Sequence, residues 1–323
     1  MKTFLRQRLP QLTTAVIFLL LFAAASFRYP YFCSTRNVAS FFTNNAALGI
    51  IAVGMTLVIF AGGIDLSVGA VAGFTNIFVT TLVENHGWSP IPAMLLGLLL
   101  GGLFGAAMGS IIQVFKQPPF LVTLAGMFFA RGCAYWISTA SIEIKNPFYA
   151  HLTDITAKLG DTTIHPLPAW ILIAVLILGY VLGHHTRFGR NLLAIGGSEQ
   201  SALLMGLPVS KTKICSYALC GTLAALGGLV STFITGSGNS TYGIGLELDA
   251  IAVVVIGGTL LTGGRGHLFG TLCGFLIIGT IQSAIDFDGS LSSWWTRIIT
   301  GGLLLTFILL QRLLLRATQK RVA

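Results

Sequence analysis

Charged side chains are rare in this chain, and the few that fall in or beside long apolar stretches are the first candidates for chemistry. Asp65 follows a Gly-Gly-Ile step, where we expect its carboxylate to cap the next helix, although it could instead pair with a cation or line a solute pathway. Arg131 lies inside an apolar stretch, where an unpaired charge costs about 2.5–3.5 kcal/mol, so we expect it to face the interior of a helix bundle. Glu247 and Asp249 open another apolar stretch, where they would cap a helix or meet an external protein.

The spacing of nucleophiles, bases and metal ligands argues against an enzyme. The chain has no Gly-x4-Gly-Lys-Ser/Thr phosphate loop, so it does not hydrolyse ATP by that route, and it has no His-Glu-x-x-His zinc motif. Ser237 lies between two glycines, but no histidine is placed to activate it, so an intramembrane protease is a weak hypothesis. The five cysteines include no pair with metal or redox spacing. We therefore predict that the chain is not an enzyme and holds no metal or cofactor of its own.

Composition places the chain in a membrane. Apolar residues make up 54% of the 323 positions and charged residues only 9%, whereas a soluble domain carries about 25% charged residues. The net charge of +9 does not indicate a nucleic-acid partner, because the basic residues lie in short segments between apolar runs rather than on one solvated face. We expect a single all-α transmembrane domain over residues 1–323, a polytopic helix bundle surrounded by membrane lipid.

Apolar runs that could cross a bilayer recur along the whole chain. A crossing helix needs about 20 apolar residues, and about ten such segments can be placed. They lie near 11–27, 45–62, 67–83, 92–114, 119–138, 168–184, 213–235, 249–262, 267–285 and 291–311. The pairs 45–83 and 249–285 are each broken by a Gly-rich hinge, so they could be half-helices or re-entrant elements. Both pairs also contain Ile-Ala-Val before a Gly-Gly hinge, which is a weak sign of an internal repeat.

Basic residues and tryptophans predict the orientation of these helices. With the N-terminus inside and alternating crossings, the inner segments hold thirteen Lys and Arg residues and the outer segments four, as the positive-inside rule requires. The tryptophans then fall at the outer boundary or in outer loops: Trp88, Trp136, Trp170, Trp294 and Trp295. The first apolar run resembles a signal peptide, but the charge pattern favours an uncleaved span. We therefore expect both termini to be cytoplasmic.

Two stripes of glycine predict close packing between helices. Glycines at intervals of four residues leave one helix face smooth, so that another backbone can approach it inside a membrane. The stripes are Gly97, Gly101, Gly105 and Gly109 in the fourth span and Gly266, Gly270 and Gly274 at the start of the ninth.

The segment of about residues 185–212 carries start and stop signals for a short helix. Ser198 is a suitable N-cap, Gly206 can end a helix in the left-handed conformation, and Pro208 prevents its continuation. These signals predict a helix over residues 199–205, held as a rigid lever between two spans. The alternative is a plain connecting loop.

Five segments match the motifs of one transporter family: GIIAVGMTLVI (49–59), GGIDLSVG (62–69), RFGR (187–190), AIGG (194–197) and ELDAIAVVVIGGTLLTGG (247–264). They resemble the permease subunits of bacterial sugar ABC importers of the ribose type, and the resemblance extends over essentially the whole chain. Three shorter segments are most similar to permeases of galactofuranose importers: LAGMFFARG (124–132), DFDG (286–289) and LSSWWT (291–296).

The resemblance implies a ribose-type ABC permease fold and a multi-pass subunit of the bacterial inner membrane that imports galactofuranose or a related monosaccharide. Two permease chains, identical or different, would form the pathway. A separate ABC ATPase subunit would use ATP, and a periplasmic sugar-binding protein would deliver the sugar. The helix near residue 200 would dock into the ATPase. The implied coupling residues are Arg187, Phe188, Gly189, Arg190, Gly196, Gly197, Ser198, Glu199 and Gly206.

A polar sugar needs hydrogen-bonding groups along its route, and the candidates are chosen by residue type. They are Asn44, Asn45, Asp65, Asn76, Thr123, Phe128 and Arg131. Phe128 could stack on a sugar ring or simply pack. The alternative to an ABC permease is a secondary transporter driven by an ion gradient. It would need buried carboxylates near mid-membrane, and none of the ten acidic residues lies clearly there.

Overall fold

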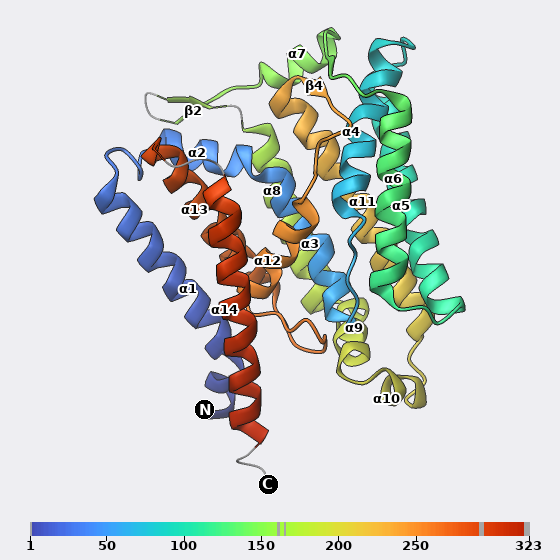
Figure 1. Ribbon diagram of the computed structural model, residues 1–323, viewed down its shortest axis with the longest axis vertical. Helices are drawn as coiled ribbons and strands as arrows, with labels where there is room; N and C mark the ends of the chain where they lie inside the picture. Colours follow the sequence, from blue (N-terminus) through green and yellow to red (C-terminus); the bar gives the residue numbers. More distant parts are fainter. Residues whose placement is uncertain (1, 160–161, 165, 291–293, 320–323) are drawn as a thin grey trace.

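The computed structural model describes residues 2–159, 162–164, 166–290 and 294–319, and the side chains within 12–152, 154–158, 166–290 and 294–309. Its helices form one bundle (Figure 1), whose upper end in this view we call the α7 end and whose lower end we call the α10 end. The first elements are α1 Lys2–Arg28, α2 Thr35–Asn44, α3 Ala46–Phe60, α4 Val68–Glu84, α5 Pro90–Val114, α6 Pro119–Ile137, β1 Ile142–Glu143, α7 Pro147–Thr153, β2 Ala157–Leu159 and β3 Thr162–Ile164. The remaining elements are α8 Leu167–Tyr180, the π-helical η1 Val181–His185, α9 Arg187–Gly197, α10 Glu199–Leu204, α11 Val209–Thr235, β4 Ser237–Gly238, α12 Leu246–Ile256, α13 Leu268–Asp288 and α14 Trp294–Gln319.

The described part of the chain is a bundle of apolar helices with four strands of two or three residues, consistent with the predicted all-α class, but it does not confirm ten helical crossings. Among the described residues, five helices are long and apolar enough to cross a membrane: α5, α6, α8 with η1, α11 and α13. A sixth is added if α2 and α3, which are bent by 53°, form one broken span. Within the described residues, α1, α4 and α14 are apolar but shorter. The expected eighth span is wrong as a complete helix, because the 11 residues of α12 extend only about 16 Å through a hydrocarbon core of about 30 Å.

A series of turns at residues 239–245, which we call the turn segment, replaces the missing half of this crossing. It leaves β4 and runs alongside α4 until α12 begins (Figure 1). A Cβ placed on Gly73 would lie 2.5 Å from the carbonyl oxygen of Tyr242, and one on Gly69 would lie 2.3 Å from that of Gly243. The backbone of the segment is therefore in direct contact with α4. Irregular backbone of this kind is tolerated at membrane depth only where protein or water satisfies its polar groups.

The centre of the bundle is α3, in which every residue from Ala46 to Phe60 is buried. This helix is apolar on all sides, as a helix enclosed by other helices must be. Helices α8, α11, α12 and α13 pack around it. The two helices that precede the Gly-Gly hinges, α3 and α12, are thus neighbours in the core, which brings the two hinges to the same part of the molecule.

Both glycine stripes lie at close helix contacts. In the first, Gly101, Gly105 and Gly109 of α5 face α11, and Gly97 faces α4. In the second, Gly270 and Gly274 of α13 face α12, while Gly266 faces Phe60 and Thr259. A Cβ on Gly270 would lie 2.0 Å from the carbonyl oxygen of Gly257, so larger residues would force these helices apart.

The five tryptophans all lie near the α7 end, and each is exposed: Trp88, Trp136, Trp170, Trp294 and Trp295. They occupy helix ends or the turn between α4 and α5, as expected for side chains at a membrane boundary. The predicted orientation rests partly on basic residues near the two chain termini. The structure does not describe their side chains: Lys2, Arg6, Arg8, Arg312, Arg316, Lys320 and Arg321.

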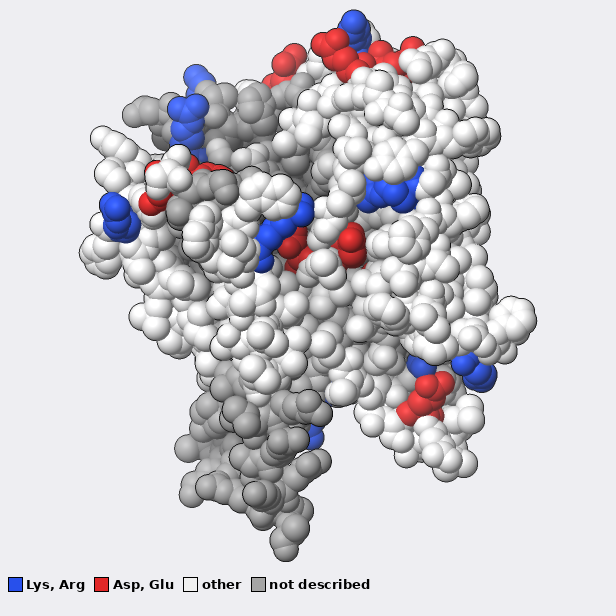
Figure 2. Space-filling model, viewed as in Figure 1, with Lys and Arg blue, Asp and Glu red and all other residues white. Residues whose placement is uncertain are grey.

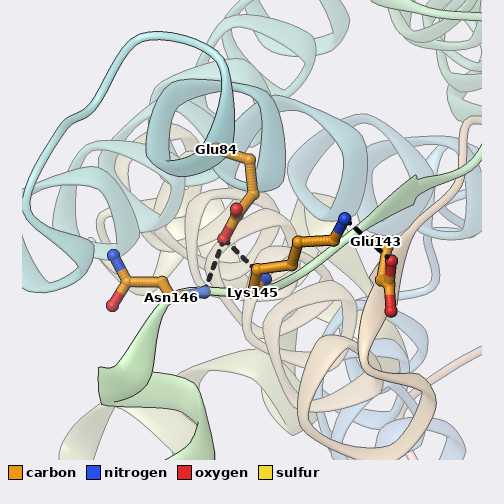
Figure 3. A network of polar contacts seen from close by, with 4 residues as sticks. All are labelled: Glu84, Glu143, Lys145 and Asn146. Carbon is orange, nitrogen blue, oxygen red and sulfur yellow. Dashed lines mark hydrogen bonds and ion pairs between the residues drawn. The ribbon is translucent and has the colours of Figure 1, made fainter.

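Polar contacts fix the segment of residues 138–153 after α6, which contains β1 and α7 and which we call the cover of the α7 end. Glu84, the last residue of α4, accepts hydrogen bonds from the backbone N–H groups of Lys145 and Asn146, both at 3.0 Å (Figure 3). An ion pair joins Lys145 to Glu143 at 3.3 Å. In α7, which follows Asn146 directly, the Tyr149 side chain is buried, and burial raises the pKa of Tyr149 to about 12. The cover is therefore ordered and anchored to α4.

Candidate functional site

Helices α9 and α10 form a compact projection at the α10 end (Figure 1). The predicted short helix is present as α10, although it ends at Leu204, one residue earlier than expected. The Ser198 hydroxyl accepts a hydrogen bond from the Ser201 N–H at 3.2 Å, and Gly206 has a φ of +76°. Helix α9 was not predicted. Its N-cap is Thr186, whose hydroxyl accepts from the Gly189 N–H at 3.3 Å.

The end of α10 exposes apolar side chains to its surroundings. Leu203, Leu204 and Met205 are 64%, 84% and 68% exposed, which is unusual at the end of a membrane bundle that faces water. Beside them, Glu199 and Lys213 form an ion pair. An exposed apolar patch with a charged border is typical of a surface that another protein covers.

Three backbone turns meet where α9 ends, and we call this contact the glycine junction (Gly62, Gly196, Gly263 and Gly264). A Cβ on Gly196 would lie 2.0 Å from the carbonyl oxygen of Phe60 and 2.4 Å from the Gly264 nitrogen. The Gly264 N–H donates to that same Phe60 oxygen at 3.1 Å. The end of α9 is thus in contact with the α3–α4 hinge and the α12–α13 hinge together.

Asp65 closes the turn that leads from the first hinge into α4. The side chain is fully buried, and its Oδ1 accepts from the N–H and the hydroxyl of Ser67 at 2.9 and 2.6 Å. The helix N-cap is Ser67 itself, so Asp65 caps the turn before the helix rather than the first helical N–H groups. Beside it, the Tyr217 hydroxyl of α11 donates to the Ile64 carbonyl at 3.4 Å. In this conformation, Asp65 is a structural residue with no access to solvent.

Arg131 and Asn76 hold the turn segment (residues 239–245) in place. The Arg131 guanidinium donates to the carbonyl oxygens of Ser240 and Tyr242, both at 2.7 Å. The Asn76 amide oxygen accepts from the Asn239 N–H at 2.6 Å, and its nitrogen donates to α11. These bonds satisfy backbone groups that lack helical partners. Arg131 therefore faces the bundle, as the sequence predicts.

Four charged side chains gather around the start of α12, and we call them the charged hollow: Arg131 of α6, Glu247 and Asp249 of α12, and Arg297 of α14. Glu247 is attracted by Arg131 and lies near Asp249, which is attracted by Arg297. Figure 2 shows acidic and basic side chains together in a hollow on one side of the bundle.

The hollow lies deeper than the sequence predicts. The Oε2 atom of Glu247 would lie 2.2 Å from a Cβ on Gly69, close to the start of α4. Gly69 is 15 residues before Glu84, which holds the cover at the α7 end. Fifteen helical residues rise about 22 Å. Glu247 therefore lies well away from the α7 end, because the turn segment carries it inward without helical periodicity.

The other pathway candidates are not brought together. Thr123 is buried and donates to the Pro119 carbonyl at 2.9 Å. Asn45 donates to the Phe41 carbonyl at 3.1 Å in the bend between α2 and α3, and Asn44 beside it is exposed. Phe128 is 67% exposed on the outside of α6. Of the residues chosen by type, only Asn76 and Arg131 lie beside the same segment.

Comparison with known proteins assigns the chain to a transport family. A family model described as branched-chain amino acid transport system / permease component matches residues 37–308. The inner membrane ABC transporter permease protein YjfF of Escherichia coli K12 is 47% identical over 308 residues, which cover 95% of this chain and 93% of that protein. The fructose import permease protein FruG of Bifidobacterium longum is 40% identical, with coverage of 95% and 92%. The ribose import permease protein RbsC of Bacillus subtilis is 37% identical, with coverage of 88% and 87%. No solved structure matches the chain.

These likenesses agree with the fold. The family model spans the bundle from α2 into α14, and the apolar helices are those of a multi-pass membrane protein. A permease component is a transport subunit rather than an enzyme. The chain therefore belongs to the family of ABC transporter permeases described as branched-chain amino acid transport system / permease component.

Proposed function

We propose that this chain is the pathway-forming permease subunit of an ATP-driven importer for galactofuranose or a related monosaccharide in the bacterial inner membrane. The observation that carries the proposal is the glycine junction, in which the projecting α9 meets the backbone of both hinges. A force applied to α9 and α10 would reach two interrupted membrane helices without passing through long, flexible side chains. A permease that is driven by a separate ATPase needs a connection of this kind.

The partners follow from the two ends of the bundle. The exposed apolar patch of α10 would dock into an ABC ATPase subunit that binds and hydrolyses ATP. The α10 end and both termini would then be cytoplasmic, in agreement with the positive-inside distribution of the sequence. The covered α7 end would receive sugar from a periplasmic binding protein. A second permease chain, identical or different, would complete the pathway.

The sugar class is proposed from two independent likenesses. Relatives are named as permeases for fructose and ribose, which supports a monosaccharide. The segments that resemble galactofuranose permeases include 124–132 and 291–296. The first contains Arg131, and the second comes directly before Arg297 in the sequence, and both of these arginines belong to the charged hollow. This placement supports the choice of galactofuranose over the other two sugars.

Reconstitution tests the proposal. The chain would be placed in liposomes with the second permease, the ATPase and the binding protein encoded beside it, and uptake of radiolabelled D-galactose, D-ribose and D-fructose would be measured. We expect uptake that requires both ATP and the binding protein, with D-galactose taken up through its furanose form. Loss of uptake when the ATPase is omitted is the matched control.

An ion-driven secondary transporter is the second candidate, because Glu247 and Asp249 lie where a coupling ion could bind. The same liposomes separate the two. Uptake by this chain alone that a proton ionophore abolishes would support the ion-driven reading and contradict the proposal.

A further inference from the structure

The charged hollow is unsuited to contact with lipid. Arg131 is 12 residues beyond the first residue of α6, or about 18 Å along the helix, so it lies well inside the span. Asp249 is partly exposed and Arg297 is exposed on the surface of the chain. Charged groups at this depth are found against a bundle interior or a water-filled cavity, because hydrocarbon does not solvate them. Water or another protein must therefore cover this face in the membrane.

The carboxylates in the hollow have unused hydrogen-bonding capacity. The Oε1 atom of Glu247 accepts a long bond of 3.3 Å from the Gly245 N–H, and its Oε2 atom is buried with no hydrogen bond from the described residues. The Asp249 carboxylate is attracted by Arg297 but accepts no hydrogen bond within the described part of the chain. A buried acceptor that lacks a donor is costly, so these oxygens are suited to a ligand that supplies hydroxyl groups.

The balance of charges indicates the class of ligand. Two carboxylates and two guanidinium groups leave the hollow near neutrality, which suits an uncharged solute. Carboxylates accept hydrogen bonds from sugar hydroxyls, and guanidinium groups donate to hydroxyl and ring oxygens. Arg297 also lies over the ring of Trp294, 5.1 Å from its centroid, so an aromatic face borders the polar groups.

We infer that Glu247 and Asp249, flanked by Arg131 and Arg297, contact the hydroxyl groups of the sugar midway along the translocation pathway. This inference rests on the proposed function. It places the pathway on the face that Figure 2 shows, along the turn segment and the start of α12. Gly69 and Gly73 leave the space on α4 into which the Glu247 carboxylate and the Arg131 guanidinium fit.

Thiol labelling tests the location without knowledge of the sugar. Asp249→Cys and Leu99→Cys would each be made in a parent that carries Cys33→Ser, because Cys33 is an exposed cysteine. The assembled transporter in liposomes would be treated with a water-soluble, permanently charged methanethiosulfonate. Leu99 is 57% exposed on α5 and serves as the lipid-facing control. We expect labelling of Asp249→Cys, slowed by D-galactose, and none of Leu99→Cys. No labelling of Asp249→Cys would overturn the inference.

Sugar uptake by variants with uncharged side chains tests whether Glu247 and Asp249 contact the sugar. Glu247→Gln and Asp249→Asn keep the shape of each side chain but remove its charge, and Glu143→Gln at the exposed cover is the matched control. Loss of a hydrogen bond to a charged group weakens sugar binding by about tenfold or more. We therefore expect ATP-dependent uptake to decrease by about tenfold or more in Glu247→Gln and Asp249→Asn, and to stay unchanged in Glu143→Gln. ATP hydrolysis stimulated by the binding protein should continue. Undiminished uptake by Glu247→Gln and Asp249→Asn would show that these side chains do not contact the sugar. If Asp249→Cys is labelled but the assembly never hydrolyses ATP, the proposed function is rejected while the location of the hollow stands.

Discussion

Replacing Gly196 with alanine should uncouple ATP hydrolysis from transport, whereas the same change at the adjacent Gly197 should not. Both residues lie in the last turn of α9. A Cβ on Gly196 would enter the glycine junction, but a Cβ on Gly197 would meet nothing within 4 Å. The two variants therefore add the same methyl group to the same helix and differ only in whether it reaches the hinges.

The size of the effect follows from the geometry of the junction. The added carbon would lie 2.0 Å from the Phe60 carbonyl oxygen, and ordinary contact begins at 3.4 Å, so α9 and the first hinge must separate by 3.4 − 2.0 = 1.4 Å. Forcing an extra methyl group into packed protein typically costs about 1–3 kcal/mol. If this penalty falls on the state in which the hinges are closed, uptake should decrease by about 5–150-fold.

The assay compares two rates in the reconstituted complex. Uptake of radiolabelled sugar and ATP hydrolysis stimulated by the binding protein would be measured together for the wild type, Gly196→Ala and Gly197→Ala. We expect Gly196→Ala to lower the number of sugar molecules taken up per ATP, with the ATPase still bound. Thermal unfolding of the purified complexes shows whether the variant has merely lost its fold. Equal sugar-to-ATP ratios in the two variants, with both complexes folded, would refute the reasoning.

Three further changes have defined outcomes. Arg131→Met leaves the carbonyl oxygens of Ser240 and Tyr242 without donors and should lower the free energy of unfolding by about 1–3 kcal/mol, measured by denaturation in detergent; unchanged stability would show that the segment does not depend on this residue. Leu204→Glu, at a side chain that is 84% exposed, should abolish co-purification of the ATPase without changing the melting temperature; retained binding would exclude α10 as the docking site. Burial raises the pKa of Tyr149 above its usual value of about 10, so its contribution to stability is complete below pH 10 and is lost as the pH rises towards 12. Tyr149→Phe should remove that alkaline decrease, and an identical decrease in both proteins would contradict the assignment.

Local signals predicted α10 and the presence of α3 well. A cap such as Ser198 and a stop such as Gly206 act within a few residues of each other, so the sequence contains all the information that the helix needs. The apolar run near 45–62 likewise predicted a helix, but an all-apolar helix can face lipid or protein, so the complete enclosure of α3 was not predicted. Helix α9 was missed because its final Gly196 and Gly197 look like a loop, whereas in the structure Gly196 makes contact with the hinges possible.

The charged hollow could not be predicted from local patterns. Arg131 bonds to Ser240, which is 109 positions away in the sequence. The turn segment has neither helical nor strand periodicity, so nothing in its composition shows that it enters the bundle. Its position depends on Gly69 and Gly73, whose missing side chains can be recognised as necessary only once α4 and the segment are seen together. Long-range contacts between irregular backbone and a helix are therefore the part of this site that requires coordinates.

The sidedness of α10 tests most directly whether an internal ATPase drives this permease. Leu204→Cys and, at the opposite end, Lys145→Cys would be made in the parent with Cys33→Ser and produced in cells that lack the partner ATPase, so that the α10 surface stays uncovered. Both variants would be treated with a membrane-impermeant thiol reagent in intact spheroplasts and in inverted vesicles. Both side chains are exposed, at 84% for Leu204 and 74% for Lys145. We predict labelling of Leu204→Cys only in inverted vesicles and of Lys145→Cys only in spheroplasts. Labelling of Leu204→Cys from outside the cell would contradict the account.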